Sequence, residues 1–244
     1  YFLTTFDIAN SNMDAHHLSQ RLLCVADLIE KGARLADIGS DHAYLPAYLA
    51  LKGQIEFGIA GEVVKGPYEN AKQEIKKEGL EDKVQARLAD GLNAIELADQ
   101  INVITICGMG GTLICDILEA GKDKLSEHPQ LILQPNVGEE NVRRWLLANN
   151  YQITAEYIME EDGHIYEVIA ASYTDEKQTL TSAELQFGPY LLQKKNAAFQ
   201  AKWQKEIAKL ETILKELNKA NQVPVAKKQA LEAKIAQIGS VLNG

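Results

Sequence analysis

The chain has 244 residues, of which 46% are hydrophobic, and a formal net charge of −9 at pH 7. This length is sufficient for one or two globular domains with a sizeable core. Its apolar runs fall short of the roughly 20 residues that span a membrane, and it begins without a signal-peptide pattern, so we expect no membrane segment. Three isolated cysteines in apolar contexts argue against a disulfide framework or a metal site and favour the reducing cytoplasm.

The first twelve residues do not lead into the pattern that follows them. Ser11 and Asn12 precede Met13 in the way that a cloning remnant would. We therefore expect natural translation to start at Met13, and we set residues 1–12 apart from the fold as a tag remnant.

Helical and strand patterns then alternate as far as residue 173. Apolar residues at helical spacing predict a first helix within 18–29. The strands that follow are expected at 34–38, 54–60, 84–88, 103–106 and 130–133, with helices at 43–52, 68–79, 92–97, 112–120 and 139–149. Two last strands, 151–160 and 165–173, flank a Glu-Asp-Gly-His turn and predict a hairpin.

This order of elements predicts an α/β fold with a Rossmann-like, doubly wound sheet that has an antiparallel edge. A terminal hairpin is typical of class I methyltransferases, whereas dinucleotide dehydrogenases end on a parallel strand. We expect the methyltransferase domain to occupy residues 13–173.

The composition changes after residue 173. Residues 174–181 read as a polar linker, and Thr181-Ser-Ala-Glu184 has the form of a capping box that begins a helix. Apolar residues then recur at steps of three and four within 203–217 and 231–242, with Pro224 between the two runs. The pattern predicts an antiparallel helical hairpin, or short coiled coil, over 182–244. A coiled coil with a partner chain is the alternative.

Charge is distributed unevenly along the chain. Residues 180–244 contain 10 lysines and arginines against 5 acids, a net of +5, and the preceding 179 residues have a net of −14. A basic tail on an acidic body favours a polyanionic partner that binds the tail. A solvated lysine-rich surface explains the charge equally well.

Acids and glycines follow the predicted strands, and a Rossmann-like sheet binds its ligand at the carboxyl ends of its strands. Glu62 lies 23 residues after Gly39, where an acid accepts both ribose hydroxyls of a cofactor. Asp90 is placed to accept from an adenine amine, and Asp41 lies where an amino-acid tail would sit. S-adenosylmethionine carries adenine, ribose and an amino acid. It has no phosphates, which fits the single glycine of this loop. Each acid alone is equally well explained as a helix cap or a loop residue.

The motifs taken together resemble one family. Asp37-Ile-Gly-Ser-Asp-His-Ala-Tyr-Leu-Pro46, Ile59-Ala-Gly-Glu62, Ile106-Cys-Gly-Met-Gly-Gly111 and Leu131-Ile-Leu-Gln-Pro-Asn136 look like those of the bacterial tRNA (adenine-22-N1)-methyltransferases, the TrmK family. The similarity covers about 13–173 and extends as a pattern to the helical tail. Cys107 departs from the alanine usual at its position.

The resemblance implies methyl transfer from S-adenosylmethionine to N1 of an adenine in the D arm of tRNA. It also implies the site residues. The expected cofactor-binding residues are Arg21, Asp37, Gly39, Asp41, His42, Glu62, Asp90, Gly91 and Gly108, and those expected to flank the adenine are Met109, Gln134, Pro135 and Asn136. His42 is included as the histidine nearest this site, and packing or capping is its main alternative role.

Adenine N1 has an in-plane lone pair, so we expect catalysis by positioning and not by a general base. N1 lies on the Watson–Crick edge, so the target must be unpaired or flipped out, with Tyr44 or Pro135 available to stack on it. Tail lysines would contact phosphates. We expect a cytoplasmic monomer or weak dimer without a metal. Two other functions fit less well: a small-molecule methyltransferase with a dimerising tail, and a non-catalytic RNA-binding module.

Overall fold

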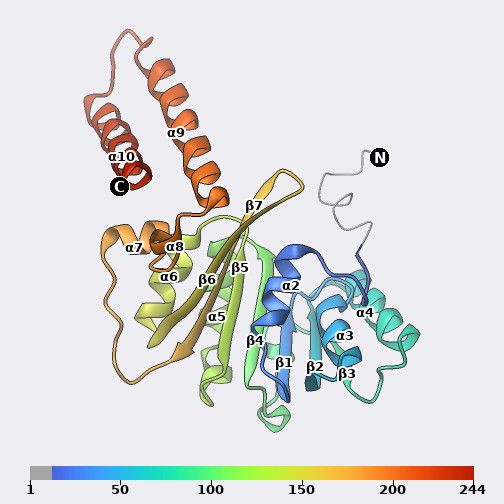
Figure 1. Ribbon diagram of the computed structural model, residues 1–244. Helices are drawn as coiled ribbons and strands as arrows, with labels where there is room; N and C mark the ends of the chain where they lie inside the picture. Colours follow the sequence, from blue (N-terminus) through green and yellow to red (C-terminus); the bar gives the residue numbers. More distant parts are fainter. Residues whose placement is uncertain (1–12) are drawn as a thin grey trace.

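The computed structural model describes residues 13–244, so the expected remnant at 1–12 lies outside the described residues. One seven-stranded sheet with strand order β3-β2-β1-β4-β5-β7-β6 forms the centre (Figure 1). The first five strands are parallel and β7 is antiparallel to both neighbours, which confirms the predicted class I methyltransferase sheet. The strands are β1 (Ala33–Ile38), β2 (Ile55–Glu62), β3 (Val84–Leu88), β4 (Val103–Met109), β5 (Gln130–Pro135), β6 (Tyr151–Glu161) and β7 (His164–Tyr173).

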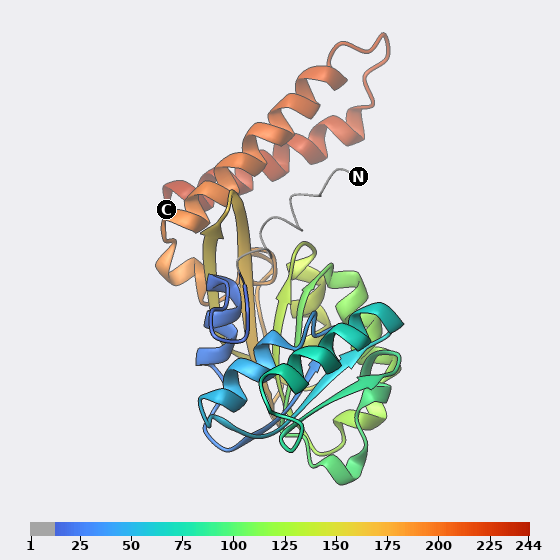
Figure 2. The same ribbon diagram turned by 90° about the vertical axis from the view of Figure 1, so that its right-hand side faces the viewer.

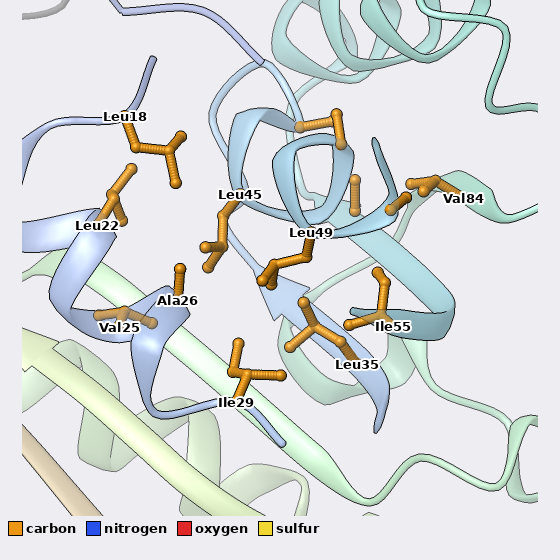
Figure 3. Close-up of a cluster of buried hydrophobic side chains, with 14 of the residues drawn as sticks. Leu18, Leu22, Val25, Ala26, Ile29, Leu35, Leu45, Leu49, Ile55 and Val84 are labelled. Atoms are coloured by element: carbon orange, nitrogen blue, oxygen red, sulfur yellow. The ribbon is translucent and has the colours of Figure 1, made fainter. Parts of the chain in front are cut away.

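Helices cover both faces of this sheet. On one face pack α2 (Gln20–Asp27), α3 (Tyr44–Leu51) and α4 (Lys65–Lys77), and on the other pack α5 (Gly111–Ala120) and α6 (Glu139–Ala148). Figure 3 shows Leu22 and Val25 of α2 beside Leu45 and Leu49 of α3, over Leu35 of β1. Because each parallel strand is buried on both faces, it reads as a continuous apolar run in the sequence.

The helix predicted at 92–97 is wrong. Two short 3-10 turns stand there, η1 (Gly91–Ala94) and η2 (Leu97–Asp99), and a third, η3 (Lys122–Leu125), follows α5. Ile95 between the first two has an extended backbone. Asp99 is held by Arg87 and by the main-chain N–H of Glu96, so local hydrogen bonds compete successfully with a continuous helix here.

The C-terminal region contains α7 (Ser182–Phe187), α8 (Leu191–Lys194), α9 (Ala197–Leu217) and α10 (Val225–Asn243). Thr181 and Glu184 form the predicted capping box. Lys195 Nζ, just before α9, donates to Val241 O near the end of α10, so the two long helices run antiparallel. Leu210 and Ile238 share one core, so the helical hairpin, which we define as α9 and α10, buries its apolar stripe within the same chain.

Figures 1 and 2 both show the helical hairpin projecting from the body on the side of the turn between β6 and β7. Its base shares a core with Ile158 of β6, Phe187 of α7 and Leu191 of α8. The domain boundaries at 173 and 182 remain a prediction, and this shared core joins the two parts closely. Within residues 13–244, none of the helices combines the length and the apolar character needed to cross a bilayer.

A buried ionic cluster fastens the helical hairpin to the sheet. Arg143 of α6 is fully buried and donates to Glu156 (2.7 Å) and Glu167 (2.6 Å) of the terminal strands. Lys202 of α9 bonds to the same Glu167 and, at 3.1 Å, to Glu139 of α6. Burial acts against the Arg143 charge, but Glu167 and Glu156 attract it and raise the pKa of the guanidinium. These charges are therefore paired on both sides of the domain junction.

Candidate cofactor and adenine site

The loop after β1 has an unusual backbone. Gly39 has a φ of 70°, and Asp41, His42 and Ala43 follow with φ of 50°, 62° and 58°. A left-handed conformation costs a non-glycine residue about 1 kcal/mol or more, and such strain is found mainly at functional sites. The main-chain N–H groups of Gly39 and Ser40 donate to Gly61 O of β2, which helps to hold the loop in place.

Neither Ser40 nor Asp41 caps α3. Ala43 is the N-cap residue and no side chain caps this helix, because the left-handed turn directs the chain differently. The Ser40 hydroxyl instead donates to Asp37, whose other oxygen accepts from Thr105 of β4 (2.6 and 2.7 Å). Asp37 is only 3% exposed, and burial raises its pKa to about 6 against the effect of these two hydrogen bonds. Asp37 therefore links the loop to β4 through its two carboxylate oxygens.

Glu62 ends β2 beside this loop. Its Oε1 accepts the main-chain N–H of Asp41 at 2.6 Å, and the residue is buried. Burial raises the pKa of Glu62 to about 7, although the hydrogen bond from Asp41 acts in the opposite direction. A buried carboxyl with a pKa near neutrality, at the carboxyl end of a parallel strand, is a strong candidate for ligand binding.

Asp90 and Gly91 follow β3, which is separated from β1 by β2 in the sheet. Both residues line a cavity of about 240 Å³ between their loop and α5. Gly91 has a φ of 55°, a conformation that favours glycine. The sheet order thus places the two predicted nucleoside contacts, Glu62 and Asp90, on the same side of the β1 loop.

A polar network fills the space on the other side of that loop. Gln134 at the end of β5 is fully buried, and its Oε1 accepts from Arg21 of α2 (2.9 Å) and from the Gly108 N–H (3.0 Å). Its Nε2 donates to Asn136 at 3.1 Å. Arg21 also lies over the Tyr166 ring, 5.6 Å from its centroid. Gln134 therefore organises the loops around it from the inside.

The loops after β4 and β5 are joined through their main chains. Asn136 N donates to Met109 O at 2.8 Å, and Gly111 N donates to Val137 O at 2.7 Å. A Cβ added to Gly111 would overlap Gly138 O, so only glycine permits this approach. The Met109 side chain lies over Gly39, where an added Cβ would overlap its methyl group. Met109 and Asn136 are thus held beside the β1 loop.

The remaining predicted residues are placed less directly. Pro135 is buried, which leaves little surface of this ring for the expected stacking of an adenine. His42 stacks on Tyr44 with ring centroids 5.1 Å apart, and both side chains are partly exposed beside the strained loop. Sequence reasoning missed Thr105 and Tyr166. A polar residue inside the apolar run of β4 was the available signal for Thr105, because a buried hydroxyl needs a partner.

The chain matches one protein family over most of its length. The model of the family TrmK, tRNA (adenine(22)-N(1))-methyltransferase, matches residues 35–240. The chain belongs to the TrmK family. A relative from Bacillus subtilis named tRNA (adenine(22)-N(1))-methyltransferase is 43% identical over 212 residues, which cover 85% of this chain and 89% of the relative.

Solved structures agree with this membership of the TrmK family. A Streptococcus pneumoniae protein in complex with S-adenosyl-L-methionine has a TM-score of 0.85 and 46% identity, covering 93% of this chain and 100% of that chain. The structure of M. capricolum TrmK in complex with S-adenosyl-homocysteine has a TM-score of 0.81 and 31% identity, covering 93% of this chain and 99% of that chain. Among residues 13–244, no group of three or more His, Cys, Asp or Glu is arranged to hold a metal ion.

Proposed function

We propose that this chain transfers the methyl group of S-adenosylmethionine to N1 of adenine 22 in tRNA. The carrying observation is the match to the Bacillus subtilis tRNA (adenine(22)-N(1))-methyltransferase over 85% of the chain. The carboxyl ends of the parallel strands supply a suitable site, since buried carboxyls, close-packed glycines and two joined loops surround them.

The residues at these strand ends fit the parts of the cofactor. The Glu62 carboxylate is suited to the ribose hydroxyls, and Asp90 beside its cavity is suited to the adenine amine. The β1 loop, with Gly39, Asp41 and His42, would receive the amino-acid part. Arg21, Asp37 and Gly108 support that loop and the network behind it. When bound, S-adenosylmethionine supplies an electrophilic methyl group.

Met109 and Asn136 are the residues that we assign to the face of the incoming adenine. Gln134 and Pro135 are buried, so we assign them the role of holding Asn136 in position. Adenine N1 is neutral at pH 7 and carries a lone pair, so it needs no deprotonation before it attacks a methyl group. Rate enhancement then comes mainly from orientation, which the joined loops provide. The Gly108-Met-Gly-Gly111 turn contains no carboxylate that could act as a base.

Glu62→Gln is expected to weaken S-adenosylmethionine binding by roughly 10- to 100-fold, the consequence of losing about 1–3 kcal/mol from a charged hydrogen-bonding group. The wild-type affinity should also rise as pH is raised through about 7, because the raised pKa of Glu62 keeps the carboxyl protonated below that pH. Titration calorimetry at several pH values measures both effects. Glu56→Gln on the exposed side of β2 is the control, and an unchanged affinity of Glu62→Gln removes this residue from the site.

The helical hairpin supplies lysines for the RNA backbone. Two lysines of the C-terminal region are used inside the protein, since Lys202 pairs with Glu139 and Glu167, and Lys195 bonds to Val241 O. The exposed lysines of this region are Lys194, Lys205, Lys209, Lys215, Lys219, Lys227 and Lys234. These are the ones that we assign to phosphate contacts.

Reversing two of them, in the double variant Lys205→Glu and Lys209→Glu, is expected to weaken tRNA binding about tenfold or more and to reduce its dependence on salt. Cofactor affinity should stay at the wild-type value. The double variant Lys76→Glu and Lys77→Glu on α4 introduces the same charge change away from the hairpin. If both double variants lower tRNA affinity equally in a filter-binding assay across salt concentrations, the hairpin has no special role.

Methylation of unmodified tRNA transcripts tests the reaction itself. The wild-type chain, with methyl-labelled S-adenosylmethionine, should place label on N1 of adenine 22, and a transcript with guanine at that position should stay unlabelled. Nucleoside mapping by mass spectrometry locates the product. Label on a small molecule alone would favour the rival methyltransferase function, and failure to bind the cofactor would favour a non-catalytic module.

The cytoplasm is the compartment that we propose, because tRNA modification takes place where tRNA is present. We also propose a monomer or weak dimer. The support is that α9 and α10 bury their apolar residues against each other within one chain.

A further inference from the structure

A groove of about 860 Å³ lies between the methyltransferase body and the helical hairpin. One wall is the segment from Asn136 to Glu140, which contains the loop after β5 and the start of α6. The opposite wall is formed by one side of α9 and α10, with Ala233 and Gln237 on α10. The groove therefore begins at Asn136, a residue that also belongs to the proposed adenine site.

The walls of this groove are held at a fixed separation. Lys202 on the α9 wall contacts Glu139 on the α6 wall at 3.1 Å, and it also bonds to Glu167. Glu167 is also paired with Arg143, which lies on α6. Moving the hairpin away from α6 would break both contacts of Lys202, leaving its ammonium group and Glu139 without these partners. The groove is consequently a preformed feature of the fold.

The lining of the groove suits nucleobases. Val137 is 67% exposed and Ile165 lies partly exposed nearby, which provides apolar contact area. Asn136, Gln186 and Gln237 add side-chain amides, which both donate and accept hydrogen bonds. Single-stranded RNA is recognised by this combination, in which unstacked bases meet apolar or aromatic surface and polar groups read their edges.

The charges in the groove support the same occupant. Glu139 pairs with Lys202 and Glu140 lies 3.5 Å from Arg144, while Glu206 is the third acid of the lining. Lys234 lies exposed on α10 and forms no ion pair within residues 13–244. The cations beside Glu139 and Glu140 weaken the repulsion of RNA by these acids, and exposed Lys234 in the lining is placed to meet a phosphate.

From this continuity and chemistry we infer that the groove binds the unpaired nucleotides of tRNA that adjoin the target adenine. The inference rests on the proposed function. Extracting one adenine from a paired arm leaves its neighbours unstacked. The groove then offers those neighbours a surface beside Asn136, so the open form of the RNA is stabilised where methyl transfer occurs.

The test is to fill the groove at an exposed alanine. Ala233→Trp places an indole in the groove, whereas Ala236→Trp makes the same change at an exposed position of α10 outside it. Fluorescence anisotropy with labelled tRNA should show at least tenfold weaker binding for Ala233→Trp and wild-type binding for Ala236→Trp. Calorimetry should give the wild-type cofactor affinity for both. Equal tRNA affinity of the two variants overturns the inference.

A second measurement locates the RNA. A photoreactive benzoylphenylalanine at Gln237 should crosslink to nucleotides next to position 22, and crosslinks confined to distant nucleotides overturn the inference as well. Both measurements read binding alone. They are therefore separable from the proposed reaction, which fails instead if the wild-type chain binds tRNA but leaves adenine 22 unmethylated.

Discussion

Replacing Arg143 with methionine is expected to lower the free energy of unfolding by roughly 3–5 kcal/mol, the usual effect of removing one partner from a buried ion pair. Arg143 is fully buried, bonds to Glu156 and Glu167, and also donates to Leu185 O. Without the guanidinium, both carboxylates stay buried, and Glu156 has no other cationic partner within residues 13–244. Urea denaturation followed by circular dichroism measures the loss.

Arg144→Met is the matched control for Arg143→Met. Arg144 is exposed and lies 3.5 Å from Glu140 on the same helix, so its loss should change stability by about 0.5 kcal/mol or less. The deficit of Arg143→Met should also shrink at acidic pH. In the wild type, burial alone would raise the pKa of Glu167, but Lys202 and Arg143 outweigh this effect and lower it. The ionised Glu167 therefore stabilises the fold at neutral pH, and this stabilisation is lost as pH falls. Equal stability of the two variants at pH 7 would refute the importance of the cluster.

Gly111→Ala is expected to reduce tRNA methylation by about 100-fold or more and to destabilise the chain by on the order of 1–3 kcal/mol. The added Cβ would overlap Gly138 O and lie 2.7 Å from Gly138 C and 3.0 Å from Val137 O. All three are main-chain atoms that cannot rotate away. The two loops must therefore separate, which moves Asn136 away from Met109. Steady-state kinetics with tRNA and thermal unfolding measure the two effects.

Gly110→Ala is the control for this loop. A Cβ at Gly110 would meet only Val137 Cγ2 at 3.8 Å, which is ordinary contact, and its φ of −67° is accessible to alanine. This variant should keep most of the wild-type activity. If Gly111→Ala is as active as Gly110→Ala, the close approach of the two loops is not needed for the reaction.

The alternation of strands and helices was predictable because it depends on local periodicity. All seven strands were expected close to where they lie, and the capping box at Thr181 was expected from four consecutive residues. The antiparallel edge of the sheet was expected from the terminal hairpin. Several strands continue further than expected, since β4 and β5 remain paired as far as Met109 and Pro135.

Features that depend on contacts between distant residues were not predictable. Asp and His enter the left-handed region more readily than most residues, but the sequence does not predict three such residues in succession at Asp41, His42 and Ala43. The partners of Arg143 come from two strands of the terminal hairpin, so their pairing exists only in the folded chain. Gln134 was expected to face the adenine, and its burial behind Gly108 depends on α2 packing over the sheet.

Because α9 is long, the ionic cluster at its base controls the position of its far end. This helix has 21 residues, so it is roughly 30 Å long, and a tilt of about 10° at its base would displace the far end by about 5 Å. Lysines near that end, such as Lys215, would then miss the phosphates that we propose they contact. The rigidity of the ionic cluster beside β7 would thus determine how accurately the distant lysines are positioned for an RNA.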